Sequence, residues 1–175
     1  MSQKSRKLPG GKVGGADEFT ITCNDEPITI LLVDDDEDCR TLIRDAISEC
    51  KVSNAIFECA NGQEALDFLN RQGPYGNKPR PGLVYLDIEM PGMDGQETLR
   101  QIRSNPEFRE IPVVMMTGVS DEQQMKLAAS NGANSYTIKP ANAEQFLRTV
   151  MTSTNYWLSI HQSPQHHLPA DECRR

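Results

Sequence analysis

The 175-residue chain lacks several patterns that would assign it at once to a class of protein. No apolar run approaches the roughly 18–20 residues of a membrane-spanning helix, so we expect no transmembrane segment and no membrane partner. No apolar core segment follows the basic residues near the N-terminus, so a secretory signal peptide is not expected either. No internal repeat is visible, and we therefore expect one globular domain rather than a repeat array.

The five cysteines include no Cys-x-x-Cys pair and are spread widely. They are Cys23, Cys39, Cys50, Cys59 and Cys173. This spacing indicates neither a structural zinc site nor a disulfide framework. Reduced thiols in a cytoplasmic protein are the simplest interpretation.

An excess of basic charge is also missing, because the net charge is −7. Acidic and basic residues balance within 1–26 and within 161–175, so the acidic excess lies in residues 27–160. Non-specific nucleic-acid binding requires Lys and Arg to neutralise phosphates, so this class of function is disfavoured. An acidic domain is better suited to holding cations.

Apolar, β-branched runs alternate along the chain with segments that carry apolar residues at helical spacing. The runs predict strands at 28–33, 54–59, 83–87, 111–117 and 133–138, each followed by a helix, the last ending near Ile160. This alternation predicts an α/β fold, a doubly wound, five-stranded parallel sheet with helices on both faces. We expect the domain to span 27–161, between flexible tails at 1–26 and 162–175.

Polar residues of suitable chemistry stand at the ends of four predicted strands. Asp34 and Asp35 end the first, Asp87 the third and Thr117 the fourth, and Lys139 follows the fifth. The carboxyl ends of parallel strands share one rim of the sheet, where open α/β sheets bind their ligands. We therefore expect the three carboxylates, the hydroxyl and the ammonium group to converge.

Carboxylates that lie close together repel one another and need a cation. A site made of oxygen ligands with few carboxylates suits Mg²⁺, and Mn²⁺ is a possible substitute. A carboxylate beside such a metal can act as a nucleophile and form an acyl phosphate. Lys139 and Thr117 could then hold phosphoryl oxygens, because phosphoryl transfer depends mainly on positioning and charge neutralisation.

Each of these residues also has an ordinary structural interpretation. A single Asp at a strand end is usually a turn or cap residue. The acidic run 34–38 resembles a solvated helix start that complements the helix dipole, and Asp36, Glu37 and Asp38 fit that role. The joint occurrence of four matched strand ends favours the functional interpretation.

Taken together, these motifs resemble the response-regulator receiver domains of two-component signalling. The resemblance covers residues 27–160, and it rests on Val33-Asp34-Asp35, on 86–95 around Asp87, on Met116-Thr117-Gly118 and on Lys139-Pro140. It implies a (βα)5, flavodoxin-like fold. It also implies that Asp87 is the phosphoacceptor.

The resemblance assigns the remaining roles by position. It implies that Asp35 binds Mg²⁺ directly, that Asp34 binds it through water, and that the backbone carbonyl of Glu89 completes the shell around Asp87. Three Asp residues follow Val33 where the family typically has two, so an offset would make the pair Asp35 and Asp36. The first pair is preferred because Asp34 directly follows the apolar run.

The family also has a switch. By analogy, Thr117 and Lys139 hold the phosphoryl oxygens, and the ring of Tyr136 turns inward when Thr117 moves. The Lys139–Pro140 bond would be cis, as in the family.

These expectations describe a stand-alone response regulator rather than an enzyme in the usual sense. A histidine kinase or a histidine phosphotransfer protein would donate the phosphoryl group to Asp87. Residues 161–175 are too short for a DNA-binding module, so output is expected through a downstream protein that binds the face of the fourth helix, fifth strand and fifth helix. That face could also form a homodimer.

The Pro-rich segment 73–82 and Tyr156-Trp157 further resemble single-domain regulators that partner phytochrome-type histidine kinases. Two alternatives remain open. One is an aspartyl-phosphate phosphatase of the haloacid-dehalogenase type, which Asp87-Ile88-Glu89 loosely resembles. The other is a phosphate shuttle or sink without an output of its own.

Overall fold

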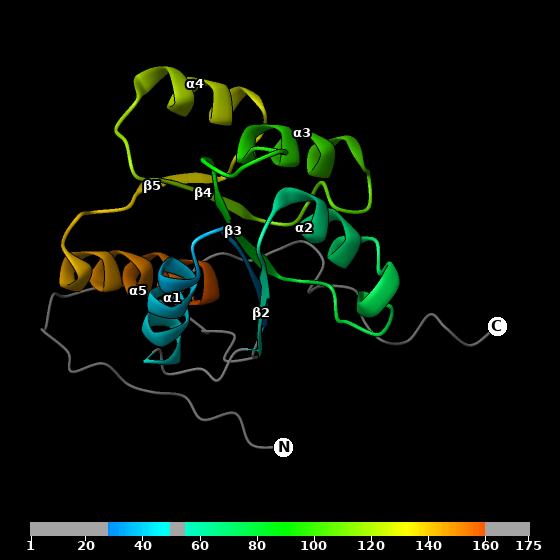
Figure 1. Ribbon diagram of the computed structural model, residues 1–175, viewed down its shortest axis with the longest axis horizontal. Coiled ribbons are helices and arrows are strands. Elements are labelled where there is room, and N and C mark those ends of the chain that lie inside the picture. Colours follow the sequence, from blue (N-terminus) through cyan, green and yellow to red (C-terminus); the bar gives the residue numbers. More distant parts are fainter. Residues whose placement is uncertain (1–27, 50–54, 160–175) are drawn as a thin grey trace, which may run out of the picture.

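The computed structural model describes residues 28–49 and 55–159, and these form the predicted doubly wound sheet (Figure 1). The strands are parallel and lie in the order β2-β1-β3-β4-β5. They are β1 (Thr29–Val33), β2 (Ala55–Cys59), β3 (Leu83–Asp87), β4 (Val113–Thr117) and β5 (Ser135–Ile138). The helices are α1 (Glu37–Ser48), α2 (Gly62–Leu69), α3 (Gly95–Ser104), α4 (Glu122–Ser130) and α5 (Ala143–Ser159), with a 3-10 turn at Gly73–Tyr75. The predicted fold class is confirmed.

The sheet separates two hydrophobic layers. Helices α1 and α5 cover one face, where Ile43 and Val150 meet Leu32 and Tyr85 of the central strands. Helices α2, α3 and α4 lie on the other face. They pack against the alternate residues of the same strands, whose side chains point to that face. β1 and β3 are almost entirely buried, as expected for parallel strands covered on both sides.

The strand register determines which side chains meet at the rim. Val33 lies opposite Leu86, and Thr117 lies opposite Ile138. The residues that follow these pairs, Asp34, Asp87 and Lys139, therefore emerge at the same edge of the sheet.

Helix α4 is attached mainly by polar contacts. Its only buried residue is Ala128. Gln96 of α3 is buried, and its amide nitrogen donates to the backbone and side-chain oxygens of Gln124 at 3.1 and 3.0 Å. The Gln96 amide oxygen accepts a hydrogen bond from Asn131 at 3.2 Å. One side chain at the start of α3 thus holds both the first turn and the C-cap of α4.

The expectation of a cis bond at Lys139–Pro140 was wrong, because no peptide bond in the described residues is cis. Trans is the lower-energy isomer of an X–Pro bond. In this conformation the Lys139 amide donates to the Thr117 carbonyl at 2.6 Å, which keeps Lys139 at the rim.

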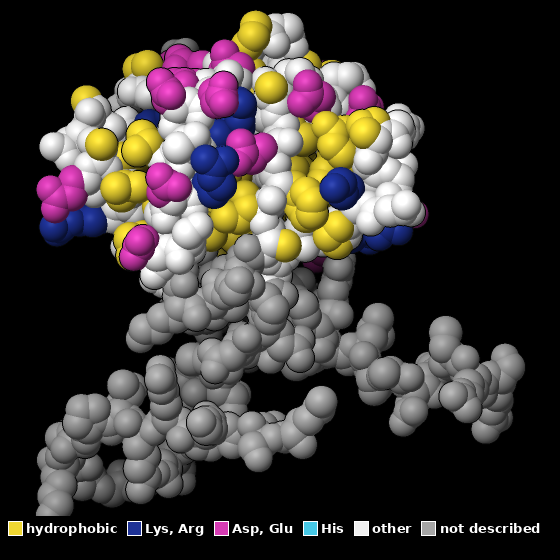
Figure 2. All heavy atoms as spheres, turned by 60° about the horizontal axis from the view of Figure 1, so that its bottom comes forward, with side chains coloured by type: hydrophobic (Ala, Val, Ile, Leu, Met, Phe, Trp, Pro, Cys, Tyr) yellow, Lys and Arg dark blue, Asp and Glu magenta, His cyan; other side chains and the backbone are white. Residues whose placement is uncertain are grey.

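The described residues include no helix with the length and apolar character that crossing a membrane demands. On the face shown in Figure 2, Lys and Arg side chains stand singly among acidic and apolar ones rather than in a continuous basic field. The predicted tails, 1–26 and 162–175, lie outside the described residues.

Candidate functional site

Three side chains from different strand ends meet at the rim. Asp34 and Asp87 are buried, with 1% and 4% of their surface exposed. Between them lies the Lys139 ammonium, whose Nζ is 2.7 Å from Asp34 Oδ2 and 2.8 Å from Asp87 Oδ1. The sequence-based expectation that these groups converge therefore describes the geometry correctly.

The two contacts of the Lys139 ammonium, with Asp34 and with Asp87, differ in geometry. Nζ donates a directed hydrogen bond to Asp34, whereas Asp87 Oδ1 lies in ion-pair range without accepting a hydrogen bond of good geometry. Burial raises the pKa of Asp87, and Lys139 offsets that rise only in part. Burial alone would lower the pKa of Lys139, but the two carboxylates outweigh it and raise the pKa above its usual value. Lys139 is therefore a permanent cation beside an under-coordinated carboxylate.

A third carboxylate completes an acidic cluster. One oxygen each from Asp34, Asp35 and Asp87 lie within 4.8 Å of one another. Asp35 is exposed and faces solvent at the mouth of the site. Three hard oxygen donors at this spacing, two of them on buried carboxylates, fit a divalent cation such as Mg²⁺ or Mn²⁺.

Asp36 has a different role from its two neighbours. Its carboxylate is the N-cap of α1 and accepts hydrogen bonds from the amides of Asp38 at 2.9 Å and Cys39 at 3.3 Å. A carboxylate occupied with a helix cap cannot also face the rim. Of the two possible acidic pairs, the geometry therefore places Asp34 and Asp35, not Asp35 and Asp36, in the cluster.

This division predicts opposite effects for two neighbouring substitutions. Asp36→Ala is expected to lower the free energy of unfolding by about 1 kcal/mol, because it removes the cap, and to leave Mn²⁺ affinity unchanged. Asp35→Ala is expected to leave stability within about 0.5 kcal/mol and to abolish detectable Mn²⁺ binding. Urea unfolding without metal and Mn²⁺ titration measure the two quantities. The assignment is wrong if Asp36→Ala is the variant that loses the metal.

The turn after β3 is built to bring α3 close to Asp87. The Ile88 carbonyl accepts hydrogen bonds from Met90 at 3.2 Å and Gly95 at 3.0 Å. A Cβ on Gly95 would lie 2.0 Å from the Asp87 carbonyl oxygen, so only glycine permits this approach. The predicted metal ligand Glu89 lies in this turn, with its side chain exposed and directed toward Gly118.

Thr117 is buried at the end of β4, with its hydroxyl engaged locally. Thr117 Oγ1 accepts from the Val119 amide at 3.2 Å and donates to the Val119 carbonyl at 3.3 Å, both long bonds. Tyr136 packs against the core on the α2–α4 face, and its hydroxyl is buried without a hydrogen-bond partner in the described residues. Burial raises the pKa of Tyr136, and the nearby Thr117 opposes this only in part.

Comparison with known proteins decides the family. The response regulator receiver domain pattern matches residues 30–151. A probable methanogenesis regulatory protein of Methanothrix harundinacea, FilR2, is 36% identical over 150 residues, which cover 86% of this chain and 96% of the relative. The chain belongs to the response regulator receiver domain family.

Solved structures of phytochrome response regulators are close matches to this receiver domain. The phosphorylated cyanobacterial regulator RcpA superposes with a TM-score of 0.76 at 32% identity, covering 79% of this chain and 99% of RcpA. Rcp1 in its Mn²⁺-bound form superposes with a TM-score of 0.75 at 31% identity over the same shares. The expected resemblance to two-component response regulators is confirmed, and a domain of this kind is generally not an enzyme in the usual sense.

Sequence reasoning missed two contacts of the receiver domain's site. Arg40 donates to the Asp34 carbonyl, although no spacing rule links it to the rim. Cys39 lies beside Asp34 and Lys139, and burial raises its pKa to about 12, so it is a neutral thiol. Cys39 and Cys59 are buried and free, and the other three cysteines lie outside the described residues.

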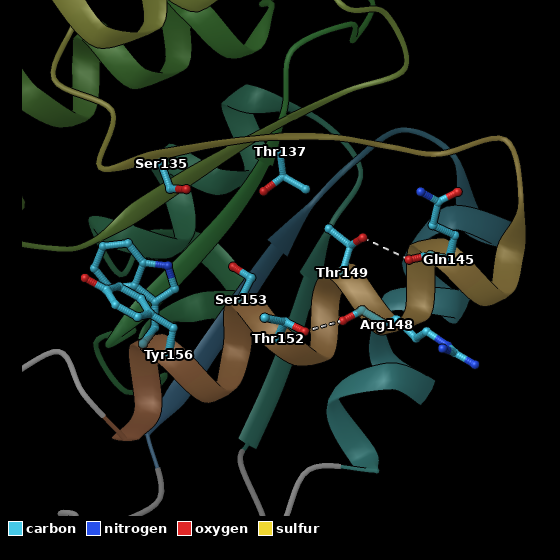
Figure 3. A pocket seen from close by; sticks show the side chains of 9 residues that line it. Ser135, Thr137, Gln145, Arg148, Thr149, Thr152, Ser153 and Tyr156 are labelled. Atoms are coloured by element: carbon cyan, nitrogen blue, oxygen red, sulfur yellow. Dashed lines mark hydrogen bonds between the residues drawn. The ribbon is translucent and has the colours of Figure 1, made fainter.

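A groove of about 520 Å³ lies apart from this rim, between β5 and α5 (Figure 3). Hydroxyl groups from both elements line it, with Arg148 and Tyr156 at its wall. Thr149 and Thr152 donate to helix carbonyls one turn back, so their hydroxyls are already engaged. The groove holds none of the acidic cluster.

The unpartnered hydroxyl of Tyr136 leads to a prediction about stability. Tyr136→Phe is expected to raise the free energy of unfolding by about 1 kcal/mol, because a buried polar group without a partner is removed. Tyr85→Phe is the matched comparison and is expected to lower it by a similar amount, since the Tyr85 hydroxyl forms a buried 2.8 Å hydrogen bond with Thr154. Urea denaturation measures both, and changes of the same sign would contradict the assigned environments.

Proposed function

We propose that the receiver domain accepts a phosphoryl group on Asp87 from a phosphohistidine of a histidine kinase or phosphotransfer protein. The observation that carries this proposal is the buried Asp87 carboxylate, whose Oδ1 lies 2.8 Å from the Lys139 ammonium and which shares the acidic cluster with Asp34 and Asp35. An Asp87 oxygen forms the new bond to phosphorus as the donor's phosphorus–nitrogen bond breaks. The Asp87 carboxylate is ionised in this step, since it must supply the electron pair.

The acidic cluster would hold the divalent cation that this chemistry needs. Asp35 and Asp87 would bind it directly, Asp34 through water, and the Glu89 carbonyl would complete the shell. When bound, Mg²⁺ or Mn²⁺ would neutralise charge on the carboxylates and on the phosphoryl oxygens. The related Rcp1 has been solved with Mn²⁺, which supports this choice of metal.

Lys139 and Thr117 would hold the phosphoryl oxygens. Lys139 Nζ already sits against Asp87, so its ammonium needs only a small movement to bind an oxygen on that carboxylate. The Thr117 hydroxyl has only long bonds to Val119, and exchanging them for a phosphoryl oxygen costs little.

Movement of Thr117 would change the position of the Tyr136 ring and the packing of α4. Tyr136 lies close to Thr117, and α4 buries only one side chain. Val119, Met125, Leu127 and Ile138 are large exposed apolar side chains on the β4–α4 turn, α4 and β5. Exposed apolar side chains on these neighbouring elements support protein–protein output through the α4–β5–α5 face.

The kinase partner is proposed from the relatives. RcpA is described as a phytochrome response regulator and AtBRR as a bacteriophytochrome response regulator, and they share 32% and 33% identity with this chain. We propose a histidine kinase of the phytochrome type as the phosphodonor, directly or through a phosphotransfer protein.

The proposal is tested by labelling purified protein with radioactive acetyl phosphate in Mg²⁺ and in EDTA. We expect at most one phosphoryl group per chain, formed only with the metal. Transfer from a phosphorylated histidine phosphotransfer protein is the second arm. No labelling with either donor in Mg²⁺ would overturn the proposal, and sustained hydrolysis of a small phosphate ester would favour the phosphatase alternative.

A further inference from the structure

Arg40 joins the acidic end of β1 to the second strand. It lies in the first turn of α1 with only 13% of its side chain exposed. One terminal nitrogen, Nη1, donates to the Asp34 backbone carbonyl at 2.5 Å. Nε donates to Glu58 Oε2 at 3.2 Å. The guanidinium group thus bridges β1 and β2 just behind the rim.

The carbonyl that Arg40 binds belongs to the peptide between Asp34 and Asp35. Other contacts hold Asp34 itself in place. The Asp34 amide donates to the Cys59 carbonyl at 3.2 Å, and the Asp34 carboxylate accepts hydrogen bonds from Lys139 and from the Asp36 amide. Asp35 itself makes no hydrogen bond or ion pair within the described part of the chain and is exposed. The shared peptide is the point from which the Asp35 side chain extends to the cluster, and Arg40 binds its carbonyl oxygen.

Glu58 anchors the Arg40 side chain and offsets part of its charge. The Glu58 carboxylate pairs with Arg40 through one oxygen and with Arg44 through the other, at 2.7 Å for Arg44. Arg40 is held at both ends of its guanidinium group, by Glu58 Oε2 and by the Asp34 carbonyl, whereas Arg44 contacts only the other oxygen of Glu58. An unpaired guanidinium this close to the cluster would repel a divalent cation, and the Glu58 carboxylate offsets that repulsion.

We propose that Arg40, held by Glu58, is a positioning residue that orients the Asp34–Asp35 peptide and so presents Asp35 to the divalent cation. This inference rests on the metal site of the proposed function. Arg40 touches neither the metal nor the phosphoryl group; it acts through the carbonyl of Asp34. Groups that orient metal ligands in this way typically contribute 10–100-fold to metal affinity.

The test measures Mn²⁺ binding to the unphosphorylated full-length protein, by the electron paramagnetic resonance signal of free Mn²⁺. We expect Arg40→Met to weaken Mn²⁺ binding at least 10-fold, and Arg40→Lys, which keeps one donor, to restore part of the loss. Arg44→Met is the matched control, because Arg44 pairs with the same Glu58 without reaching Asp34; we expect less than a twofold change. Circular dichroism in each sample confirms that the measured protein is folded.

A second readout separates positioning from general damage. In labelling with acetyl phosphate, Arg40→Met should raise the half-saturating Mg²⁺ concentration about 10-fold while the rate at saturating Mg²⁺ stays within about twofold. Glu58→Gln should shift the same quantity in the same direction. If Arg40→Met proves unstable, Arg40→Lys and Glu58→Gln carry the test.

The outcomes distinguish a failure of the metal site from a failure of the positioning role of Arg40. If the wild-type protein binds no Mn²⁺, the metal site fails and this inference fails with it. If wild type binds Mn²⁺ and Asp35→Ala abolishes binding, but the Arg40 variants bind as wild type does, the positioning role is wrong and the proposed function stands. Equal losses in Arg40→Met and Arg44→Met would also refute the positioning role, because Arg44 does not contact the Asp34 carbonyl.

Discussion

Replacing Lys139 by methionine is expected to slow phosphorylation of Asp87 by about 100-fold or more. Removing one preorganised charged donor from a transferring group typically costs this much. The same change should lower the free energy of unfolding without metal by about 3 kcal/mol, because it leaves two buried carboxylates without their cation. Mn²⁺ affinity should increase, since the ammonium that competes for the carboxylates has gone.

Lys126→Met is the control for this variant. Lys126 forms a surface ion pair with Glu122, and 74% of its side chain is exposed. Its replacement should change stability by less than about 0.5 kcal/mol and leave labelling unchanged. Stopped labelling time courses and urea unfolding in EDTA measure the effects. Normal labelling of Lys139→Met would remove Lys139 from the proposed chemistry.

Asp87→Asn is expected to stabilise the metal-free fold at neutral pH while abolishing labelling. Burial raises the pKa of Asp87, so the folded state binds this proton more tightly than the unfolded state does. The contribution favours folding below the unfolded pKa and is lost as pH rises through the folded pKa. At pH 7 the ionised carboxylate therefore costs stability, and Asn should recover about 1 kcal/mol.

The dependence on pH makes this prediction specific. The gain from Asp87→Asn should shrink as pH falls toward and below 3.8, the ordinary pKa of the carboxyl group, because the carboxyl group then becomes protonated in the unfolded state as well as in the folded state. Lys139 keeps Asp34 as a partner in the variant, so the ion pair is not lost entirely. Asp35→Asn is the control, because Asp35 is exposed and should show little gain at any pH. A loss of stability in Asp87→Asn at pH 7 would show that the Lys139 contact outweighs the cost of burial.

The strand ends could be derived from sequence because one rule governs them all. Parallel strands end at a common rim, so the apolar runs before Asp34, Asp87 and Thr117 fixed the meeting place of these residues before any contact was known. The choice between Asp34–Asp35 and Asp35–Asp36 was less secure. It depends on which carboxylate turns back to cap α1, and the sequence shows only three identical side chains in a row.

Other contacts had no signal in the sequence. Arg40 and Glu58 lie 18 positions apart on a helix and a strand, and no periodicity relates them. Glutamine is usually found on the protein surface, and the Gln96 amide is buried only because α3 packs against α4. The trans Lys139–Pro140 bond departs from the family analogy, because local sequence does not determine the isomer of an X–Pro bond.

The most direct measurement of the central claim is the location of the phosphoryl group. Protein treated with acetyl phosphate and Mg²⁺ is reduced with borohydride, which converts an aspartyl phosphate to the corresponding alcohol, and its peptides are mapped by mass spectrometry. We predict a single modified residue, Asp87, in wild type and none in Asp87→Asn or in wild type treated in EDTA. Modification at another carboxylate, or an unmodified Asp87 in wild type, would contradict the account.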